Sequence, residues 1–141
     1  MREVSRKQKV PIIGISEHAR LTALATAASA RMPAVSDALL AGLETAKVVA
    51  ADRVPADVVR MGSVVECRDD SGSVKRMTLV YPEEADISQG RISVLTPLGA
   101  VLIGLAKGQS VGWESRDGRR LSVEIVDVVP ASAELATGDA S

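Results

Sequence analysis

The sequence predicts an α+β fold, in which a short N-terminal antiparallel helical hairpin precedes an antiparallel sheet covered by one short helix. Two patterns lead to this prediction. Apolar residues recur at helical spacing in the first third of the chain, and the later part alternates with a period of two between turn residues. The length of 141 residues is also typical of one domain with an aliphatic core.

The first helix is expected to follow an extended segment, Val10 to Ile15. Ser16 is the candidate N-cap, and Glu17 would lie favourably in the first turn. Pro33 is expected to end the helix, because proline cannot continue the backbone hydrogen bonds. The apolar stripe consists of Leu21, Leu24, Ala25 and Ala28.

A second helix is expected after Ser36, which is its candidate cap, and its apolar positions continue to Ala50. Each helix would hold about 14 residues, so the hairpin would be only about 21 Å long. The apolar positions of the second helix are Leu39, Leu43, Ala46 and Ala50.

The later part predicts two β-hairpins and a third strand between them. Thr96 followed by Pro97 is typical of a helix start, and Gly104 fits as the residue that ends this short helix. We expect a helical hairpin in residues 1–53, a domain in residues 54–130 and a frayed tail in residues 131–141. The expected strands are 63–69, 74–81, 91–95, 110–114 and 120–128, with turns at 70–72 and 116–119 and an acidic loop at 82–90.

The composition excludes several classes of site. The only aromatic residues are Tyr81 and Trp113, which disfavours stacking platforms for single-stranded nucleic acid. The net charge of −1 lacks the basic excess of a protein that binds a phosphate backbone, although residues 1–53 are mildly basic and the rest mildly acidic. Cys67 is alone, which excludes an internal disulfide and fits a cytoplasmic location. No apolar run reaches the length of a membrane span, and no targeting segment is expected.

Residues with catalytic potential are few. No glycine-rich phosphate loop is present, His18 is expected to lie at the surface, and Cys67 is expected to be a small buried hydrophobe. Trp113 could anchor a partner or pack within the fold. The acidic residues are open to two interpretations, as a Mg²⁺ or acid–base pair or as solvated loop acids. They are Glu83, Glu84 and Asp86, which we expect beside Asp69 and Asp70 on neighbouring turns.

Several segments together resemble the C-terminal domain of the Gre transcript-cleavage factors, the GreA/GreB elongation factor family. In more detail, the chain resembles the Rnk-type regulators of nucleoside diphosphate kinase, which carry this domain behind a short helical hairpin. The resemblance covers about residues 10 to 128. The segments that carry it are Val10 to Ile13, Pro55 to Val59, Met61 to Val65, Leu79 to Asp86, Ile92 to Gly99, Leu102 to Gly104 and Gly108 to Val111.

The resemblance implies an FKBP-like domain that docks on bacterial RNA polymerase at the rim of its secondary channel. In the Gre factors, two acidic residues at the tip of a long coiled coil help to position a catalytic Mg²⁺. Here the arm is truncated, and its tip region, Met32 to Asp37, carries only one acid, with Glu44 about two turns into the second helix. FKBP-like folds also host prolyl isomerases, but those need an aromatic-lined pocket, and this chain has no Phe.

We therefore expect a non-enzymatic, cytoplasmic transcription regulator that binds the polymerase without stimulating cleavage. No catalytic residue, cofactor, metal or small-molecule substrate is expected, and DNA or RNA would be reached only through the polymerase. Two alternatives stay open, namely weak cleavage stimulation through Asp37 and indirect regulation of nucleoside diphosphate kinase. The candidate polymerase-contact residues are Asp37, Ser93, Thr96, Pro97, Leu98 and Gly99.

Overall fold

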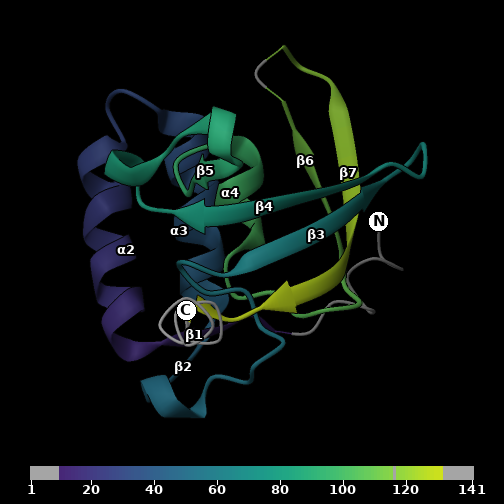
Figure 1. Cartoon of the computed structure of the whole chain (residues 1–141). Coiled ribbons are helices and arrows are strands. Elements are labelled where there is room, and N and C mark those ends of the chain that lie inside the picture. Colours follow the sequence, from purple (N-terminus) through teal and green to yellow (C-terminus); the bar gives the residue numbers. More distant parts are fainter. Residues whose placement is uncertain (1–9, 116, 132–141) are drawn as a thin grey trace.

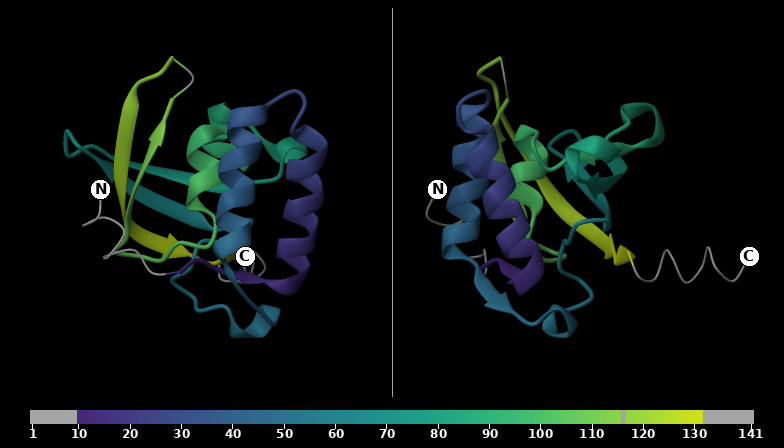
Figure 2. Two further views of the ribbon diagram at one scale, coloured as in Figure 1. Left: turned by 180° about the vertical axis from the view of Figure 1, so that it is seen from behind. Right: turned by 90° about the vertical axis from the view of Figure 1, so that its left-hand side faces the viewer.

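The computed structural model describes residues 10–115 and 117–131, which form a mixed α+β fold. Helices α2 and α3 lie side by side, a curled sheet forms the other part of the molecule, and α4 lies between them (Figures 1 and 2). Within the described ranges, no helix combines the length and apolarity that crossing a membrane requires. The elements are β1 (Ile12–Gly14), α2 (Ile15–Ala28), α3 (Pro33–Thr45), β2 (Lys47–Val49), η1 (Ala51–Arg53), β3 (Val64–Asp69), β4 (Val74–Val80), η2 (Pro82–Glu84), η3 (Ile87–Gln89), β5 (Arg91–Ser93), α4 (Pro97–Leu102), β6 (Ser110–Glu114) and β7 (Arg120–Val129).

The two expected N-terminal helices are present, with 14 residues in α2 and 13 in α3. Their apolar stripes face the interior and join the main core. Ser36, expected as a cap, is instead fully buried inside α3, where its hydroxyl donates a 2.6 Å hydrogen bond to the carbonyl oxygen of Ala25 in α2. The buried positions are Leu21, Ala25 and Ala28 in α2 and Val35, Ser36, Leu39 and Leu43 in α3.

The expected helix ends were wrong in two further places. The N-cap of α2 is Gly14 rather than Ser16, and no side chain caps this helix. Helix α2 ends at Ala28, before any proline, and Pro33 is the first residue of α3. Proline fits this position because the first helical N–H has no intrahelical partner.

The second helix does not continue to Ala50. It ends at Thr45, and Lys47–Val49 forms β2, which pairs in parallel with β1. The β-branched Val48 and Val49 favour an extended backbone, although Ala46 and Ala50 fit a helical spacing. The sequence gave no sign of this small sheet, because its two strands lie on either side of the helical pair.

The main sheet has the order β5-β4-β3-β7-β6. The two expected hairpins are present, since β3 pairs with β4 and β6 pairs with β7, both antiparallel. The expectation of a wholly antiparallel sheet was wrong, because β5 pairs in parallel with β4. The connection between them contains η2 and η3 and brings the chain back to the same end of the sheet before β5 begins.

Helix α4 begins as the sequence predicted, with Thr96 as its N-cap, Pro97 as its first residue and Gly104, at φ +85°, just beyond its end. One core cluster unites α2, α3, α4 and the main sheet. The FKBP-like description and the division at residue 53 stay predictions, and the expected tail lies outside the described residues from 132 onward. The largest fully buried apolar side chains are Ile13, Leu21, Leu39, Leu79, Leu102, Ile125, Val59, Val65 and Val94.

Candidate functional site

The segment from Ser93 to Gly99 forms a tight turn that joins β5 to α4. The Thr96 hydroxyl donates to the Ser93 carbonyl oxygen at 2.7 Å and accepts from the Gly99 N–H at 3.1 Å. The Ser93 hydroxyl accepts from the N–H of Leu95 at 2.9 Å. Two of the candidate contact side chains, Ser93 and Thr96, therefore hold the turn itself together.

Gly99 has a steric role in the same turn. A Cβ atom at this position would overlap the Ser93 carbonyl oxygen and lie 3.0 Å from the Val94 Cα. Because both neighbours are backbone atoms, they cannot yield cheaply. Gly99 therefore lets α4 start directly against the end of β5.

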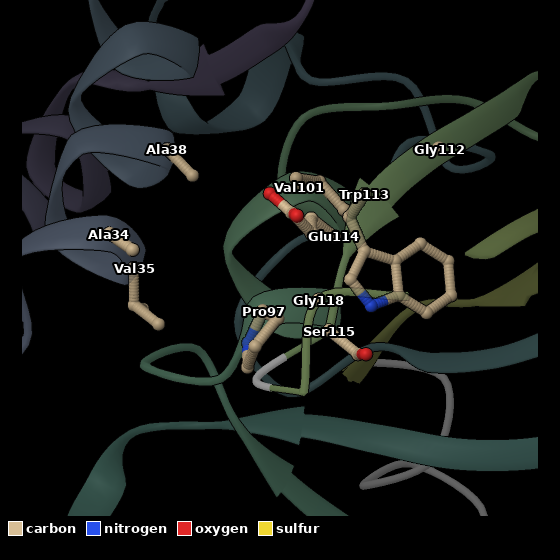
Figure 3. A pocket seen from close by; sticks show the side chains of 10 residues that line it. All are labelled: Ala34, Val35, Ala38, Pro97, Val101, Gly112, Trp113, Glu114, Ser115 and Gly118. Atoms are coloured by element: carbon tan, nitrogen blue, oxygen red, sulfur yellow. The ribbon is translucent and has the colours of Figure 1, made fainter. Parts of the chain in front are cut away.

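Pro97 and Leu98 are the candidate residues that this turn leaves half-exposed, and they face different hollows. Pro97 lines a groove of about 560 Å³ between α3, α4 and the strand β6 (Figure 3). Leu98 lines a smaller hollow of about 270 Å³ against the sheet, beside Met77 and Val123. Trp113 borders both hollows, so it lies at the edge of the fold and not in the central core.

The groove has mostly small or apolar walls. Ala34, Val35 and Ala38 point into it from α3, Pro97 and Val101 line it from α4, and β6 closes the other side (Figure 3). This volume lies within the usual range of ligand sites. The residues that line it are Ala34, Val35, Ala38, Pro97, Val101, Gly112, Trp113, Glu114, Ser115 and Gly118.

Asp37 lies apart from the Ser93–Gly99 turn. It is exposed on α3, three residues after Ala34, and so lies beside the groove without lining it. Glu44, expected two turns into the helix, is one residue from the C-terminal end of α3 and cannot act together with Asp37 at the tip. The structure therefore does not bring two carboxylates together at the connection between α2 and α3.

The acidic residues of the two loops do not form one cluster. The turn that holds Asp69 and the loop that holds Asp86 lie at opposite ends of β4. Each carboxylate shapes its own turn, since Asp69 accepts from the N–H groups of Ser71 and Ser73, and Asp86 accepts from Ser88. These hydrogen bonds lower the pKa of Asp69. Within the described ranges, no group of three potential ligand side chains is placed to hold a metal ion.

His18 and Cys67 have structural surroundings. His18 is not a free surface residue as expected, because its Nε2 lies 2.9 Å from the carbonyl oxygen of Leu43 and so links the start of α2 to the end of α3. Cys67 is buried as expected, and burial raises the pKa of its thiol to about 11. A thiol with this pKa is a poor nucleophile at neutral pH.

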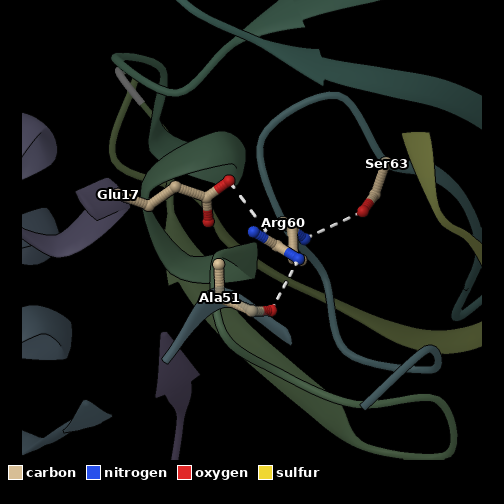
Figure 4. Close-up of polar contacts among 4 residues, drawn as sticks. All are labelled: Glu17, Ala51, Arg60 and Ser63. Carbon is tan, nitrogen blue, oxygen red and sulfur yellow. Dashed lines mark hydrogen bonds and ion pairs between the residues drawn. The ribbon is translucent and has the colours of Figure 1, made fainter. Parts of the chain in front are cut away.

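Sequence reasoning missed the polar contacts that attach α2 to the rest of the fold. The carboxylate of Glu17 lies 3.6 Å from Arg60 Nε, and Arg60 also donates to the carbonyl oxygen of Ala51 at 3.2 Å, while its N–H donates to Ser63 Oγ at 2.8 Å (Figure 4). One turn later, Arg20 lies over the ring of Tyr81. Glu17 in a first helical turn was the only signal, and it does not reveal a partner so distant in sequence.

Comparisons with known proteins agree on one family. Residues 54–130 match the family model described as transcription elongation factor, GreA/GreB, C-term. The regulator of nucleoside diphosphate kinase of Escherichia coli K12 is 39% identical over 95 residues, which cover 67% of this chain and 70% of that relative. The transcription elongation factor GreA of Nitratidesulfovibrio vulgaris (Miyazaki F) is 43% identical over 82 residues, 57% of this chain but only 51% of that relative.

A solved structure extends the similarity to most of the chain. The prokaryotic transcription elongation factor GreA/GreB from Nitrosomonas europaea superposes with a TM-score of 0.70 at 36% identity, covering 85% of this chain and 99% of that one. This match shows that the whole described fold is GreA-like. By sequence and by structure, the chain belongs to the GreA/GreB C-terminal domain family, within which it is similar to the regulator of nucleoside diphosphate kinase.

Proposed function

We propose that this chain is a non-enzymatic regulator that binds bacterial RNA polymerase near its secondary channel and does not stimulate transcript cleavage. A role like that of a transcription factor follows from its family. The polymerase, the place of binding and the absence of cleavage are our own inference from the surface described above.

The observation that carries the proposal is the Ser93–Gly99 turn. Its side chains are used up in internal hydrogen bonds, so the backbone around Pro97 and Leu98 is fixed before any partner arrives. A fixed loop loses little conformational entropy on binding. Pro97 and Leu98 are half-exposed and flank apolar hollows, which suits recognition of a protein surface.

The helical pair supports binding without cleavage. Fourteen residues in α2 correspond to about 21 Å of helix. The pair is also packed along the fold and does not project as a free arm, because Leu21 and Leu39 are fully buried in the common core. Asp37 is the acid nearest its tip, and a single carboxylate is a weak ligand set for Mg²⁺.

The test is retention of purified core RNA polymerase by the immobilised full-length chain. We expect the wild type to retain polymerase and Leu98→Glu to lose most of it. Ile87→Glu is the matched control, because Ile87 is 79% exposed on η3, away from the turn, and receives the same charge. Circular dichroism checks that both variants fold. No retention by a folded wild type would refute the proposal, and so would equal retention by all three proteins.

A second candidate function comes from the relative that is named a regulator of nucleoside diphosphate kinase. The sequence has no glycine-rich phosphate loop, so any such effect here would be indirect and would not require a nucleotide site. Calorimetry with a nucleoside diphosphate should therefore show no binding. Saturable binding would support a direct role in nucleotide metabolism instead.

A further inference from the structure

The groove between α3, α4 and β6 is bordered by a strand edge. Strand β6 is at the end of the main sheet, and within the described ranges it pairs with β7 alone. An unpaired strand edge offers a row of backbone donors and acceptors to another chain.

The direction of these backbone groups follows from the ladder. Ile125 N–H donates to the Gln109 carbonyl oxygen at 2.8 Å, and Ser115 N–H donates to the Arg119 carbonyl oxygen at 2.8 Å. In an antiparallel pair, hydrogen-bonded residues alternate with residues whose backbone groups point outward. The inward positions are therefore the odd-numbered residues, and the N–H and C=O groups of Gly112 and Glu114 point away from β7.

The wall opposite this edge is shaped for a narrow segment. Ala34 and Ala38 are one turn apart on α3, and their short side chains face the groove, while Pro97 and Val101 of α4 line it as well (Figure 3). At the centre of the edge, Gly112 has no side chain to cover its own backbone. An extended segment with modest apolar side chains would meet both the strand edge and these walls.

The charge of the groove defines the segment further. Glu114 lines the groove, and Asp37 lies beside it on α3. Across residues 10–115 and 117–131, neither carboxylate lies in an ion pair or accepts a hydrogen bond. Two unpaired acids beside an apolar groove favour a basic partner.

We infer that this groove binds an extended, lysine- or arginine-bearing segment of a protein partner, which adds to the edge of β6 as a sixth strand of the main sheet. Backbone hydrogen bonds to Gly112 and Glu114 would provide the affinity, and the Glu114 carboxylate would select basic side chains. The inference deepens the proposed function, on which it rests for the nature of the partner, by adding a second contact beside Pro97.

The probe is a short acetylated peptide of alternating lysine and valine, titrated into the full-length chain while backbone amide shifts are followed by NMR. We expect saturable shifts at Gly112, Glu114, Ala34 and Ala38. A peptide of alternating glutamate and valine should give none. The same lysine peptide with N-methylated backbone amides should also fail, because it cannot donate to the strand edge.

Substitution of Gly112 separates backbone pairing from shape. Gly112→Pro removes the outward N–H and should weaken peptide binding about fivefold, the effect of one hydrogen bond. Gly112→Ala keeps that N–H, and its Cβ would have 3.4 Å to the nearest atom, so it should bind within about twofold of wild type. If Gly112→Pro fails to fold, Glu114→Gln should weaken binding about threefold, and Glu124→Gln on β7, an equal change of charge away from the groove, should not.

Four results would overturn the inference. They are absence of saturable shifts, equal binding of the acidic peptide, loss of self-association in Gly112→Pro, and shifts of residues 2–9 in Gly112→Pro but not in Gly112→Ala. The last two would assign the groove to a second copy or to the chain's own basic N-terminal segment. Peptide binding by a chain that retains no polymerase would support this inference and refute the proposed function. Polymerase retention with no peptide binding would do the reverse.

Discussion

The carboxylate of Glu17, in the first turn of α2, lies 3.6 Å from the guanidinium group of Arg60, in the segment that leads into β3. The side chain of Glu17 is only 17% exposed, and its Oε1 is buried without a hydrogen-bond partner among the described residues. This contact joins the start of the helical pair to the part of the chain that matches the family model. It also places an ionisable group where burial and charge pairing oppose each other.

Glu17→Gln should stabilise the fold at neutral pH. Burial raises the pKa of Glu17, and the attraction of Arg60 offsets this only in part. A carboxyl whose pKa is raised binds its proton more tightly in the folded state, so the free energy of unfolding falls as the pH rises through the titration. The stabilisation by Gln should therefore be present at about pH 7 and should shrink below the ordinary carboxyl pKa, near about pH 4.

Urea unfolding at the two pH values measures this difference, with Glu44→Gln on the exposed side of α3 as the control. The control should change stability equally little at both. A loss of stability in Glu17→Gln at neutral pH would show that the ion pair with Arg60 outweighs the burial of the charge.

Ser36→Ala should destabilise the protein by about 1–3 kcal/mol, because it leaves the carbonyl oxygen of Ala25 without its buried donor. This carbonyl lies in the last turn of α2, where backbone acceptors lack intrahelical partners. Ser29→Ala is the matched control, since Ser29 makes a similar bond to Thr26 on the exposed surface. Urea unfolding should show a change below about 0.5 kcal/mol for the control. Equal effects of the two substitutions would contradict the role given to Ser36.

Gly99→Ala should destabilise the protein by about 1–3 kcal/mol or prevent folding, because its Cβ meets backbone atoms of Ser93 and Val94. Gly42→Ala is the opposite case, since no atom lies within 4 Å of the Cβ position inside α3. That substitution should stabilise the protein by about 0.5–1 kcal/mol through the higher helix propensity of alanine. Thermal unfolding of the pair should move in opposite directions, and a neutral Gly99→Ala would refute the steric argument.

Asp37→Ala should leave RNA in a stalled elongation complex unchanged in length, as should the wild type, because one exposed carboxylate cannot hold Mg²⁺ firmly. The measurement is gel analysis of labelled transcripts after incubation with the full-length chain. Asp52→Ala, an exposed acid in η1, is the control. Cleavage by the wild type that Asp37→Ala abolishes and Asp52→Ala retains would establish the alternative function.

Most elements of the fold could be predicted because their signals are local. Period-two segments around glycine turns located both hairpins, and the Thr96-Pro97 pair located α4 to the residue. The errors fell where distant contacts decide. Lys47–Val49 is a strand because β1 lies beside it, and β5 is parallel because of the path of the connection before it.

The candidate site shows the same division. The sequence by itself determined the family, through short motifs such as Ile92 to Gly99, and also the aliphatic core and the short helical pair. Only the tertiary structure decided that Ser93, Thr96 and Gly99 support the turn while Pro97 and Leu98 face outward. It also decided that α3 lies opposite the edge of β6. The physical reason is that periodicity records which side of an element is apolar, whereas the neighbour of that side depends on contacts between residues far apart in the chain.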